Sequence, residues 1–391
     1  MNYIDLEKRY IFQTYKRVPV VFVKGKDSYL YDENGKKYLD MFSGISVSSV
    51  GYCNPKVISA AKKQLDNLIH LTNIYYSRPQ VNLAMMLSTL SIKGKVFFSN
   101  SGAEANECAI KLARKFGNKD GRYEIISFEN SFHGRTIATL SATGQKQFHK
   151  GFAPLVKGFK FAIFNDISSV KKMCTKKTCA VIIEPVQGES GIYPADKKFL
   201  SELRNFCREK NILLIFDEIQ CGLGRTGNLF AYKSYGVIPD IITLAKSLGG
   251  GLPIGATIAK KELADIFEYG DHGSTFGGNP ICCAAAEEVV KFVNNKKLLK
   301  KITGNGKFFI NGLKKLQKKY PLLIKEIRGI GYMAAAELYV EGAEIVNKCL
   351  EAGLLINCTK KKTLRFLPPL TAGKNELLKV LSILENVLGK N

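Results

Sequence analysis

ILLIFDEIQ, residues 212–220, is the stretch that decides the fold. Its first five residues are apolar, and two acids, Asp217 and Glu218, follow at once. Apolar residues at every position, rather than at alternate ones, are typical of a parallel strand that is covered on both faces. Ligands of open α/β sheets bind outside the carboxyl ends of the strands. The stretch therefore predicts a parallel sheet with a binding site near Asp217.

Similar apolar runs occur on both sides of this stretch, and segments with helical patterns separate them. The runs are VFFSN (96–100), YEIISF (123–128), CAVIIEP (179–185), DIITLA (240–245) and IGATIA (254–259). Strands that alternate with helices indicate an α/β fold with a mostly parallel sheet. We therefore predict that residues 46–285 form a large domain of this class.

The flanking segments have other patterns. Residues 1–45 contain short strand patterns with a turn at Asn34-Gly35. Residues 286–391 contain a long lysine-rich helical pattern, followed by strand patterns near RGIGYMAAAEL and TLRFLPPL. We expect residues 286–391 to form a smaller α+β domain, which the N-terminal segment 1–45 joins.

The charge of the chain raises the question of a nucleic-acid partner. The 391 residues are 46% hydrophobic and carry a formal net charge of +24. The lysines are spread along the whole chain, and no RRM-like, helix-turn-helix or zinc-finger pattern accompanies them. We therefore expect a lysine-rich surface that helps attract anionic metabolites, and no nucleic-acid partner. A noncatalytic basic binding protein is the remote alternative.

The N-terminal residues and the cysteines bear on the compartment. The start, MNYIDLEKRYIFQTYKR, mixes acids and bases without an apolar stretch, so no signal peptide is expected. No uncharged apolar run approaches the roughly 18 residues that a membrane-spanning helix needs. The 10 cysteines include no CxxC pair, which favours reduced thiols and no metal site. The sequence predicts a cytoplasmic protein without a membrane partner.

A candidate phosphate site lies where VFFSN meets a helical pattern. Ser101 suits the N-cap of that helix, and Gly102 and Ala103 leave the first N–H groups uncovered. Free N–H groups and the helix dipole both favour an anion. Many α/β junctions cap helices in this way, so this motif alone leaves phosphate binding open.

Two charged residues at strand ends extend this pattern. A buried carboxylate at Asp217 requires a cation, either a protein side chain or a protonated ligand such as a pyridine. Lys246 directly follows DIITLA and precedes Gly249–Gly251. A lysine in a dry site loses its proton more easily and can form a Schiff base. A structural ion pair at Asp217 and a lysine that only reaches the surface are the alternatives.

A glycine motif in the same region suggests a different cofactor. Gly222, Gly224 and Gly227 fit GxGxxG, the dinucleotide-binding fingerprint. These glycines do not open a helix, because Gly236 and Pro239 interrupt the segment that follows. NAD binding is therefore not expected.

Seven motifs follow one another along nearly the whole chain. They are SNSGAEANE, SFHGRT, IIEPVQGE, FDEIQCGLGRTG, TLAKSLGGGLPIGA, HGSTFGGNP and LRFLPPL. In this order they resemble the motifs of class III aminotransferases of PLP fold type I, and specifically the branch that acts on acetylornithine. The resemblance implies pyridoxal 5′-phosphate (PLP) as cofactor.

The resemblance implies roles for four residues at the cofactor ring. Lys246 would hold PLP as a covalent aldimine and would shuttle the proton once substrate displaces it. Asp217 would keep the ring nitrogen protonated, so that the ring accepts electrons from the substrate. Phe132 would stack on the ring, and Gln220 would form a hydrogen bond with its phenolic oxygen.

The phosphate contacts implied by the resemblance involve two subunits. Gly102 and Ala103, in the helix that Ser101 caps, would bind the phosphate through backbone N–H groups. Thr275 would reach the phosphate of the neighbouring subunit's cofactor. A homodimer with shared active sites is therefore expected.

Five residues are implied at the substrate. Arg135 would bind a carboxylate far from the reacting end of acetylornithine, and Arg365 the α-carboxylate of glutamate or 2-oxoglutarate. Glu189 would cover Arg365 while the δ-amine reacts and release it for glutamate. Ser274 and Tyr15 would also lie at the substrate.

The implied reaction transfers an amino group from N2-acetyl-L-ornithine to 2-oxoglutarate. It yields N-acetylglutamate 5-semialdehyde and L-glutamate, in arginine biosynthesis. Tyr15 with Arg17, the segment HLTNIYYSRPQ (70–80), and the pair Phe132-His133 resemble this branch. Ornithine, succinylornithine and 4-aminobutyrate aminotransferases share the cofactor motifs and stay as alternatives.

Overall fold

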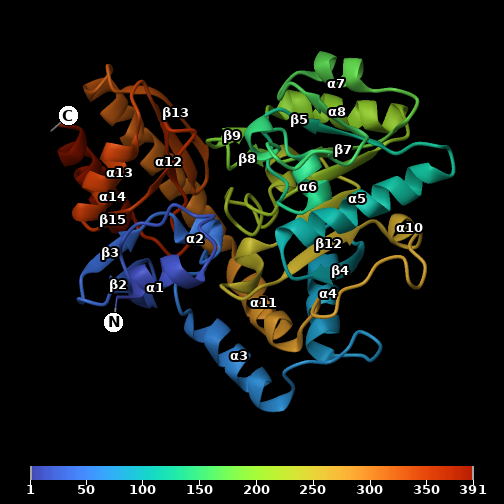
Figure 1. Ribbon diagram of the computed structural model, residues 1–391, viewed down its shortest axis with the longest axis horizontal. Coiled ribbons are helices and arrows are strands. Elements are labelled where there is room, and N and C mark those ends of the chain that lie inside the picture. Colours follow the sequence, from blue (N-terminus) through green and yellow to red (C-terminus); the bar gives the residue numbers. More distant parts are fainter. Residues whose placement is uncertain (1, 390–391) are drawn as a thin grey trace.

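The computed structural model describes residues 2–389, and its largest element is a seven-stranded sheet covered by helices (Figure 1). The strands, in spatial order, are β4 (Lys95–Ser99), β12 (Gly255–Ala259), β11 (Ile241–Leu244), β10 (Leu213–Asp217), β7 (Thr178–Ile183), β5 (Glu124–Phe128) and β6 (Phe159–Ala162). β12 pairs antiparallel with both of its neighbours, and the other pairs are parallel. The predicted α/β fold with a mostly parallel sheet is confirmed.

Both faces of this sheet are buried, as the continuous apolar runs predict. Along β10, Leu213 and Ile215 belong to one hydrophobic cluster, whereas Leu214 and Phe216 belong to another. Helix α5 (Gly102–Asn118) contributes to the first cluster. The second cluster receives residues from the helices α3 (Pro55–Asn67), α4 (Arg78–Leu90), α8 (Lys197–Glu209) and α11 (Pro280–Val293).

Strand β6 is the one strand of this sheet that the sequence patterns missed. It lies at the edge of the sheet and pairs only with β5. Three of its four residues, including Lys160, are only partly buried. An edge strand covered in part therefore lacks the continuous apolar run by which the others were recognised.

Two smaller sheets lie beside the large one and join the two ends of the chain (Figure 1). The first consists of β1 (Phe22–Lys26), β2 (Tyr29–Asp32), β3 (Lys37–Asp40) and β15 (Leu354–Leu355). The second consists of β13 (Ile324–Ile330), β14 (Met333–Leu338), β17 (Thr363–Phe366) and β16 (Asn357–Thr359). Because β15 pairs with β3, the N-terminal strands share one sheet with a strand from the C-terminal part of the chain.

The remaining helices pack beside the smaller sheets or connect the strands. They are α1 (Tyr3–Tyr10), α2 (Ser43–Ser46), α6 (Ile137–Ala142), α7 (Ile167–Met173), α9 (Tyr232–Tyr235), α10 (Lys261–Ala264), α12 (Lys296–Lys319), α13 (Ala343–Glu351), α14 (Lys374–Leu388) and the 3-10 turns at Lys146–Phe148 and Lys246–Gly249. A short hairpin pairs β8 (Val186–Gln187) with β9 (Tyr193–Pro194). The predicted domain boundaries at 45 and 285 stay predictions, and residue 285 lies within α11.

Local sequence signals account for several turns. The predicted Asn34-Gly35 turn joins the antiparallel strands β2 and β3, and Gly35 has a φ of 79°. In the segment that contains Gly222, Gly224 and Gly227, turns rather than a helix follow β10.

All ten cysteines are free thiols. Among residues 2–389, no helix combines the length and the apolar character that a membrane crossing requires, and no cluster of metal-binding side chains occurs.

Candidate active site

A cavity of about 240 Å³ lies beyond the carboxyl ends of the central strands. Residues that follow β4, β5, β7, β10 and β11 line it. They are Gly102, Ala103, Phe132, His133, Gly134, Arg135, Glu184, Glu189, Asp217, Ile219, Gln220 and Lys246. Eight of these side chains or backbones were predicted from the sequence as site residues. The topology thus gathers motifs that are far apart in the chain.

Lys246 begins a 3-10 turn directly after β11. Its φ of 45° lies in the left-handed region, which is unfavourable for a residue with a side chain. Burial lowers the pKa of Lys246, although the charges of Asp217 and Glu184 oppose this effect. Its amine forms no hydrogen bond or ion pair with any residue between 2 and 389. The geometry therefore presents a free amine that loses its proton readily.

Asp217 is fixed by three hydrogen bonds. Its Oδ2 accepts from His133 Nδ1 at 2.7 Å and from Asn106 Nδ2 at 2.8 Å. Its Oδ1 accepts from the backbone N–H of Ile219 at 3.1 Å. Asn106 is itself oriented by Thr243, whose hydroxyl donates to Asn106 Oδ1 at 2.8 Å. The carboxylate is therefore buried in one orientation.

The start of helix α5 forms another wall of the cavity. Ser101 is the N-cap, as its sequence position predicts, and its hydroxyl accepts from the backbone N–H of Glu104 at 3.2 Å. The N–H groups of Gly102 and Ala103 form no hydrogen bond within the described part of the chain, and both residues line the cavity. An anion held here would interact with free N–H groups and with the helix dipole.

Gln220 and Phe132 lie at the same cavity. Gln220 Oε1 is buried and has no hydrogen-bond partner among the described residues. It packs so closely on Gly188 that a Cβ atom at position 188 would lie 1.9 Å from this oxygen. The ring of Phe132 packs edge-on against Phe148, and its backbone N–H donates to Glu184 at 2.9 Å. Burial raises the pKa of the Glu184 carboxyl.

These features fit PLP. The unpaired amine of Lys246 and the free N–H groups at the start of α5 match an aldehyde and a phosphate. The buried carboxylate of Asp217 matches a protonated ring nitrogen, and the buried, unpartnered Oε1 of Gln220 could accept a hydrogen bond from a phenolic hydroxyl. The aromatic face of Phe132 suits the ring itself.

The two arginines expected at the substrate occupy different surroundings. Arg365 is buried and donates to the carbonyl of Gly188 at 2.9 Å and to Asn357 Oδ1 at 3.1 Å. Burial lowers its pKa to about 10. Arg135 is exposed, and its guanidinium lies over the ring of Phe148, 3.9 Å from the centroid.

Glu189 lies at the cavity but is not paired with Arg365. Its carboxylate accepts a hydrogen bond of 2.6 Å from Gln145 Nε2. Within residues 2–389 no ion pair joins Glu189 to Arg365. In this structure the carboxylate of Glu189 therefore does not cover Arg365. The expected switch between the two states stays a prediction.

Five predicted residues are not among those that line the cavity: Ser101 and Arg365, described above, and Ser274, Thr275 and Tyr15. Ser274 Oγ accepts from Asn100 Nδ2 at 3.2 Å and from the backbone N–H of Gly277 at 2.9 Å. Thr275 is exposed to solvent. Tyr15 is also exposed, at 71%, and its ring packs against the guanidinium of Arg17. Ser274, Thr275 and Tyr15 therefore do not line the cavity that Lys246 lines in the same chain.

The sequence reasoning missed several residues that hold the site together. His133 and Asn106 orient Asp217, Glu184 binds the backbone of Phe132, and Gln145 binds Glu189. Two of them carry a sequence signal. Asn106 is a polar residue on the buried face of α5, and Glu184 follows an apolar strand as Asp217 does.

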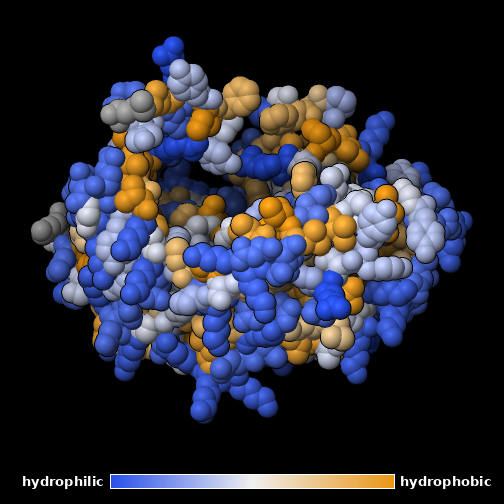
Figure 2. Space-filling view, turned by 90° about the horizontal axis from the view of Figure 1, so that it is seen from below, coloured by the Kyte–Doolittle hydropathy of each residue, from blue (hydrophilic) through white to orange (hydrophobic). Residues whose placement is uncertain are grey.

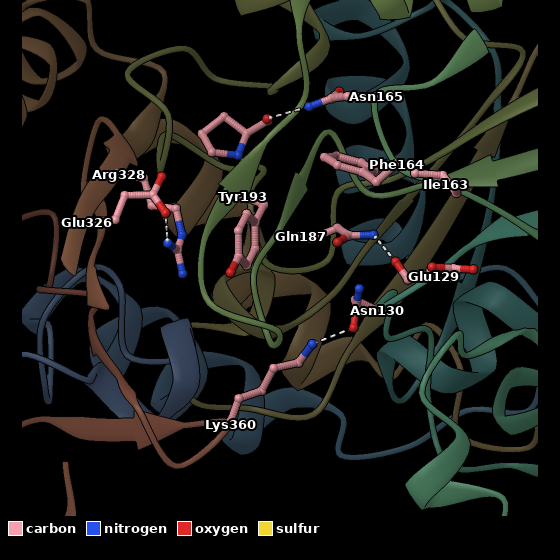
Figure 3. A pocket seen from close by; sticks show the side chains of 11 residues that line it. Glu129, Asn130, Ile163, Phe164, Asn165, Gln187, Tyr193, Glu326, Arg328 and Lys360 are labelled. Carbon is pink, nitrogen blue, oxygen red and sulfur yellow. Dashed lines mark hydrogen bonds and ion pairs between the residues drawn. The ribbon is translucent and has the colours of Figure 1, made fainter. Parts of the chain in front are cut away.

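A neighbouring cavity of about 400 Å³ lies between the large sheet and the C-terminal sheet (Figure 3). Arg328 and Tyr193 lie on one side of it, Glu129 and Asn130 on the other, and Lys360 reaches toward Asn130. Neither Lys246 nor Asp217 lines this cavity. The chemistry therefore belongs to the smaller cavity.

Comparison with known proteins gives one consistent result. Residues 10–388 match the model of the family described as aminotransferase class-III. The acetylornithine aminotransferase of Methanocaldococcus jannaschii is 54% identical over 389 residues, which cover 99% of this chain and 98% of that protein. A crystal structure of the ornithine aminotransferase of Toxoplasma gondii has a TM-score of 0.95 at 33% identity, covering 99% and 94% of the two chains. A second structure of that enzyme, crystallised with oxidised glutathione, holds PLP at partial occupancy in its active site; its TM-score is also 0.95 at 33% identity, with 99% and 93% covered.

Proposed function

The chain belongs to the class-III aminotransferases, and from this premise we propose that it transfers the amino group of N2-acetyl-L-ornithine to 2-oxoglutarate. It is a PLP-dependent enzyme. When bound, PLP supplies the aldehyde that receives the amino group and a ring that accepts the electrons of the broken C–H bond. The residues of the chain bind and orient the cofactor and the substrate, and they move the protons. The observation that carries the proposal is the convergence of Lys246, Asp217 and the start of α5 on one cavity.

Lys246 is proposed as the catalytic base and acid. Its Nζ would remove the proton from the substrate carbon that bears the amino group and would later return a proton on the cofactor side. The lowered pKa of this amine supports the proposal, because a base must be unprotonated before it accepts a proton. Asp217 would face the ring nitrogen and keep that nitrogen protonated. The three hydrogen bonds to Asp217 support a fixed position for this charge.

The two arginines would bind carboxylates in the two half-reactions. Arg365 would bind the α-carboxylate of glutamate or 2-oxoglutarate, because its Nη2 forms no hydrogen bond with the described residues. Arg135 would bind the carboxylate of acetylornithine at the open side of the cavity. Glu189 would neutralise Arg365 while acetylornithine reacts through its distal amine. This arrangement would allow one cavity to accept both an α-amine and a δ-amine.

Comparison with proteins of similar sequence favours acetylornithine over the related amino donors. The M. jannaschii protein, an acetylornithine aminotransferase, is 54% identical, whereas the T. gondii ornithine aminotransferase is 33% identical. Ornithine is the second candidate, supported by that close structural match. With acetylornithine as donor, the enzyme would act in arginine biosynthesis. We place it in the cytoplasm, a reducing compartment that suits ten free cysteines.

A half-reaction without keto acid tests the donor. The yellow holoenzyme is mixed separately with N-acetylornithine, ornithine and 4-aminobutyrate, and the loss of the visible absorption is followed. Fastest bleaching with N-acetylornithine is expected. Faster bleaching with ornithine would transfer the proposal to ornithine and leave the cofactor chemistry intact.

We also propose that two copies of the chain share their active sites. Thr275 is exposed and lies outside its own cavity, as a residue that reaches a neighbour's phosphate would. Large apolar side chains are exposed as well, among them the next residue, Phe276, at 62% and Tyr76 at 95%. Figure 2 shows groups of hydrophobic residues among the charged ones on the lower face of the molecule. Analytical ultracentrifugation is expected to give a dimer, and a monomer would contradict this part of the proposal.

A further inference from the structure

Gln145 holds the carboxylate of Glu189 in a defined place. The side chain of Gln145 is buried, and its Nε2 lies 2.6 Å from Glu189 Oε2. The amide is oriented by two further contacts, one from its Nε2 to the carbonyl of Ser131 at 3.3 Å and one from Gln147 Nε2 to its Oε1 at 3.4 Å. Its nitrogen therefore faces Glu189. A hydrogen bond to a charged group is among the stronger ones in proteins.

The backbone that carries Glu189 is fixed from the opposite side. Three carbonyls of this loop accept hydrogen bonds from the C-terminal part of the chain: Gly188 from Arg365 at 2.9 Å, Glu189 from Thr359 at 2.7 Å, and Gly191 from Arg328 at 2.9 Å. Figure 3 shows Lys360 reaching from that part toward Asn130, and Arg328 beside Tyr193. Because the loop is held at three of its residues, the side chain of Glu189 can turn while its backbone stays in place.

Arg365 keeps hydrogen-bonding capacity at one nitrogen of its guanidinium. Its Nε and Nη1 are engaged by Asn357 and Gly188, but its Nη2 forms no hydrogen bond within the described residues. The charge of Glu189 acts on this guanidinium, since it partly offsets the effect of burial on the Arg365 pKa. Arg365 Nη1 also bonds the carbonyl of Gly188, the residue directly before Glu189. Glu189 thus has Arg365 beside its backbone as an alternative partner, while its carboxylate is hydrogen-bonded to Gln145.

We propose that Gln145 is a positioning residue that holds Glu189 away from Arg365, so that Arg365 is open to the α-carboxylate of a dicarboxylic substrate. The carboxylate of Glu189 has two positions on one fixed backbone, the amide of Gln145 and the guanidinium of Arg365. A turn of this side chain alone selects between the two half-reactions. Gln145 thereby sets the balance between them. The inference rests on the proposed roles of Glu189 and Arg365.

Replacing Gln145 with methionine tests this, because methionine keeps the length of the side chain and removes its hydrogen-bond donor. Without that donor, Glu189 is expected to turn to Arg365. The affinity of the holoenzyme for glutarate, a dicarboxylate that has no amine and cannot react, is measured by calorimetry. It is expected to fall about tenfold, the size expected for losing a hydrogen bond to a charged group. The KM for glutamate should rise by a similar factor. The rate of the half-reaction with N-acetylornithine should stay within about twofold of the wild-type rate.

A second background shows whether Gln145 acts through Glu189. In the Glu189→Ala variant, adding Gln145→Met should leave glutarate affinity unchanged, because there is no carboxylate left to move. Gln317→Met is the matched control, since the Gln317 amide donates to the carbonyl of Lys325 at 2.8 Å and is not hydrogen-bonded to Gln145 or Glu189 in residues 2–389. If Gln145→Met does not fold, Gln145→Asn, which is too short to reach Glu189, is expected to give the same loss.

The outcomes separate this inference from the proposed function. Wild-type enzyme that does not react with N-acetylornithine would remove the proposed function, whatever Gln145 does. Wild-type enzyme that does react, together with equal glutarate affinity in Gln145→Met, would overturn the role of Gln145 alone. Equal losses in the presence and absence of Glu189 would also overturn it, because Gln145 would then act on the ligand directly.

Discussion

The two sides of the cavity are held together in different ways. On the Asp217 side, the polar groups follow strands of the large sheet, and three donors fix one carboxylate. On the Glu189 side, the groups come from a loop and from the C-terminal sheet. Glu189 and Arg365 lie within electrostatic reach of each other but each has another partner.

This difference corresponds to two demands of the reaction. The chemistry at the cofactor is the same in both half-reactions, so it benefits from one rigid arrangement. The substrates differ in the placement of their carboxylates, so their binding groups must have two arrangements of similar free energy. The comparison predicts large losses of rate for changes near Asp217 and smaller changes of preference near Glu189.

The largest effect is expected for Lys246→Ala. Without the amine, the group proposed to take the proton of the substrate carbon is gone, so turnover should fall at least about a thousandfold. PLP should still bind noncovalently, which absorption spectra and dialysis can measure. Lys261→Ala, at an exposed lysine, is the control and should be unaffected. Substantial residual turnover in Lys246→Ala would refute its assignment.

Asp217→Asn tests the rigid side next. The side chain keeps its shape but loses the charge that would hold a proton on the ring nitrogen. We expect a loss in kcat of about a hundredfold or more, since breaking a buried charge pair costs several kcal/mol. Thermal unfolding, followed by circular dichroism, shows whether the fold is kept. A variant that is stable and fully active would mean that Asp217 has a structural role only.

Glu189→Ala tests the adaptable side. With no carboxylate to cover Arg365, the half-reaction with glutamate should improve relative to that with N-acetylornithine by about tenfold, a difference of about 1.4 kcal/mol in activation free energy. Single-turnover rates with each donor measure the ratio. An unchanged ratio would contradict the idea that Glu189 alternates between partners.

The smallest effect is expected for Thr275→Ala. Loss of one hydroxyl contact to the partner's cofactor phosphate should weaken PLP retention about fivefold, in line with about 1 kcal/mol for a single hydrogen bond. Equilibrium dialysis measures the affinity, and ultracentrifugation shows that the oligomeric state is kept. Equal PLP affinity in the variant would argue against phosphate sharing between subunits.

Prediction from the sequence succeeded where the signal is local. Asp217 and Lys246 follow apolar strands directly, and Ser101 precedes a helical pattern, so strand ends and a helix cap place all three. Five of the six predicted apolar runs lie in the interior of the seven-stranded sheet, where burial on both faces makes the run continuous. Strand β6 at the edge lacks that signal.

The partners of these groups could not be predicted in the same way. Asn106 reaches Asp217 across 111 positions of sequence, and Gln145 reaches Glu189 across 44. Such contacts depend on how whole elements pack and on which rotamer each side chain adopts. The periodic patterns of the sequence predict neither the packing of distant elements nor the rotamer of a side chain.

The sequence by itself therefore determined the sheet, the cofactor motifs and the strand ends at which they lie, because backbone pairing and burial impose short repeating patterns. Only the tertiary structure decided that Asp217 is held by His133 and Asn106, that Glu189 is bound by Gln145, and that Arg365 is uncovered. Hydrogen bonds are short and directional, so a partner is chosen by the final packing of distant segments rather than by the residues next to it.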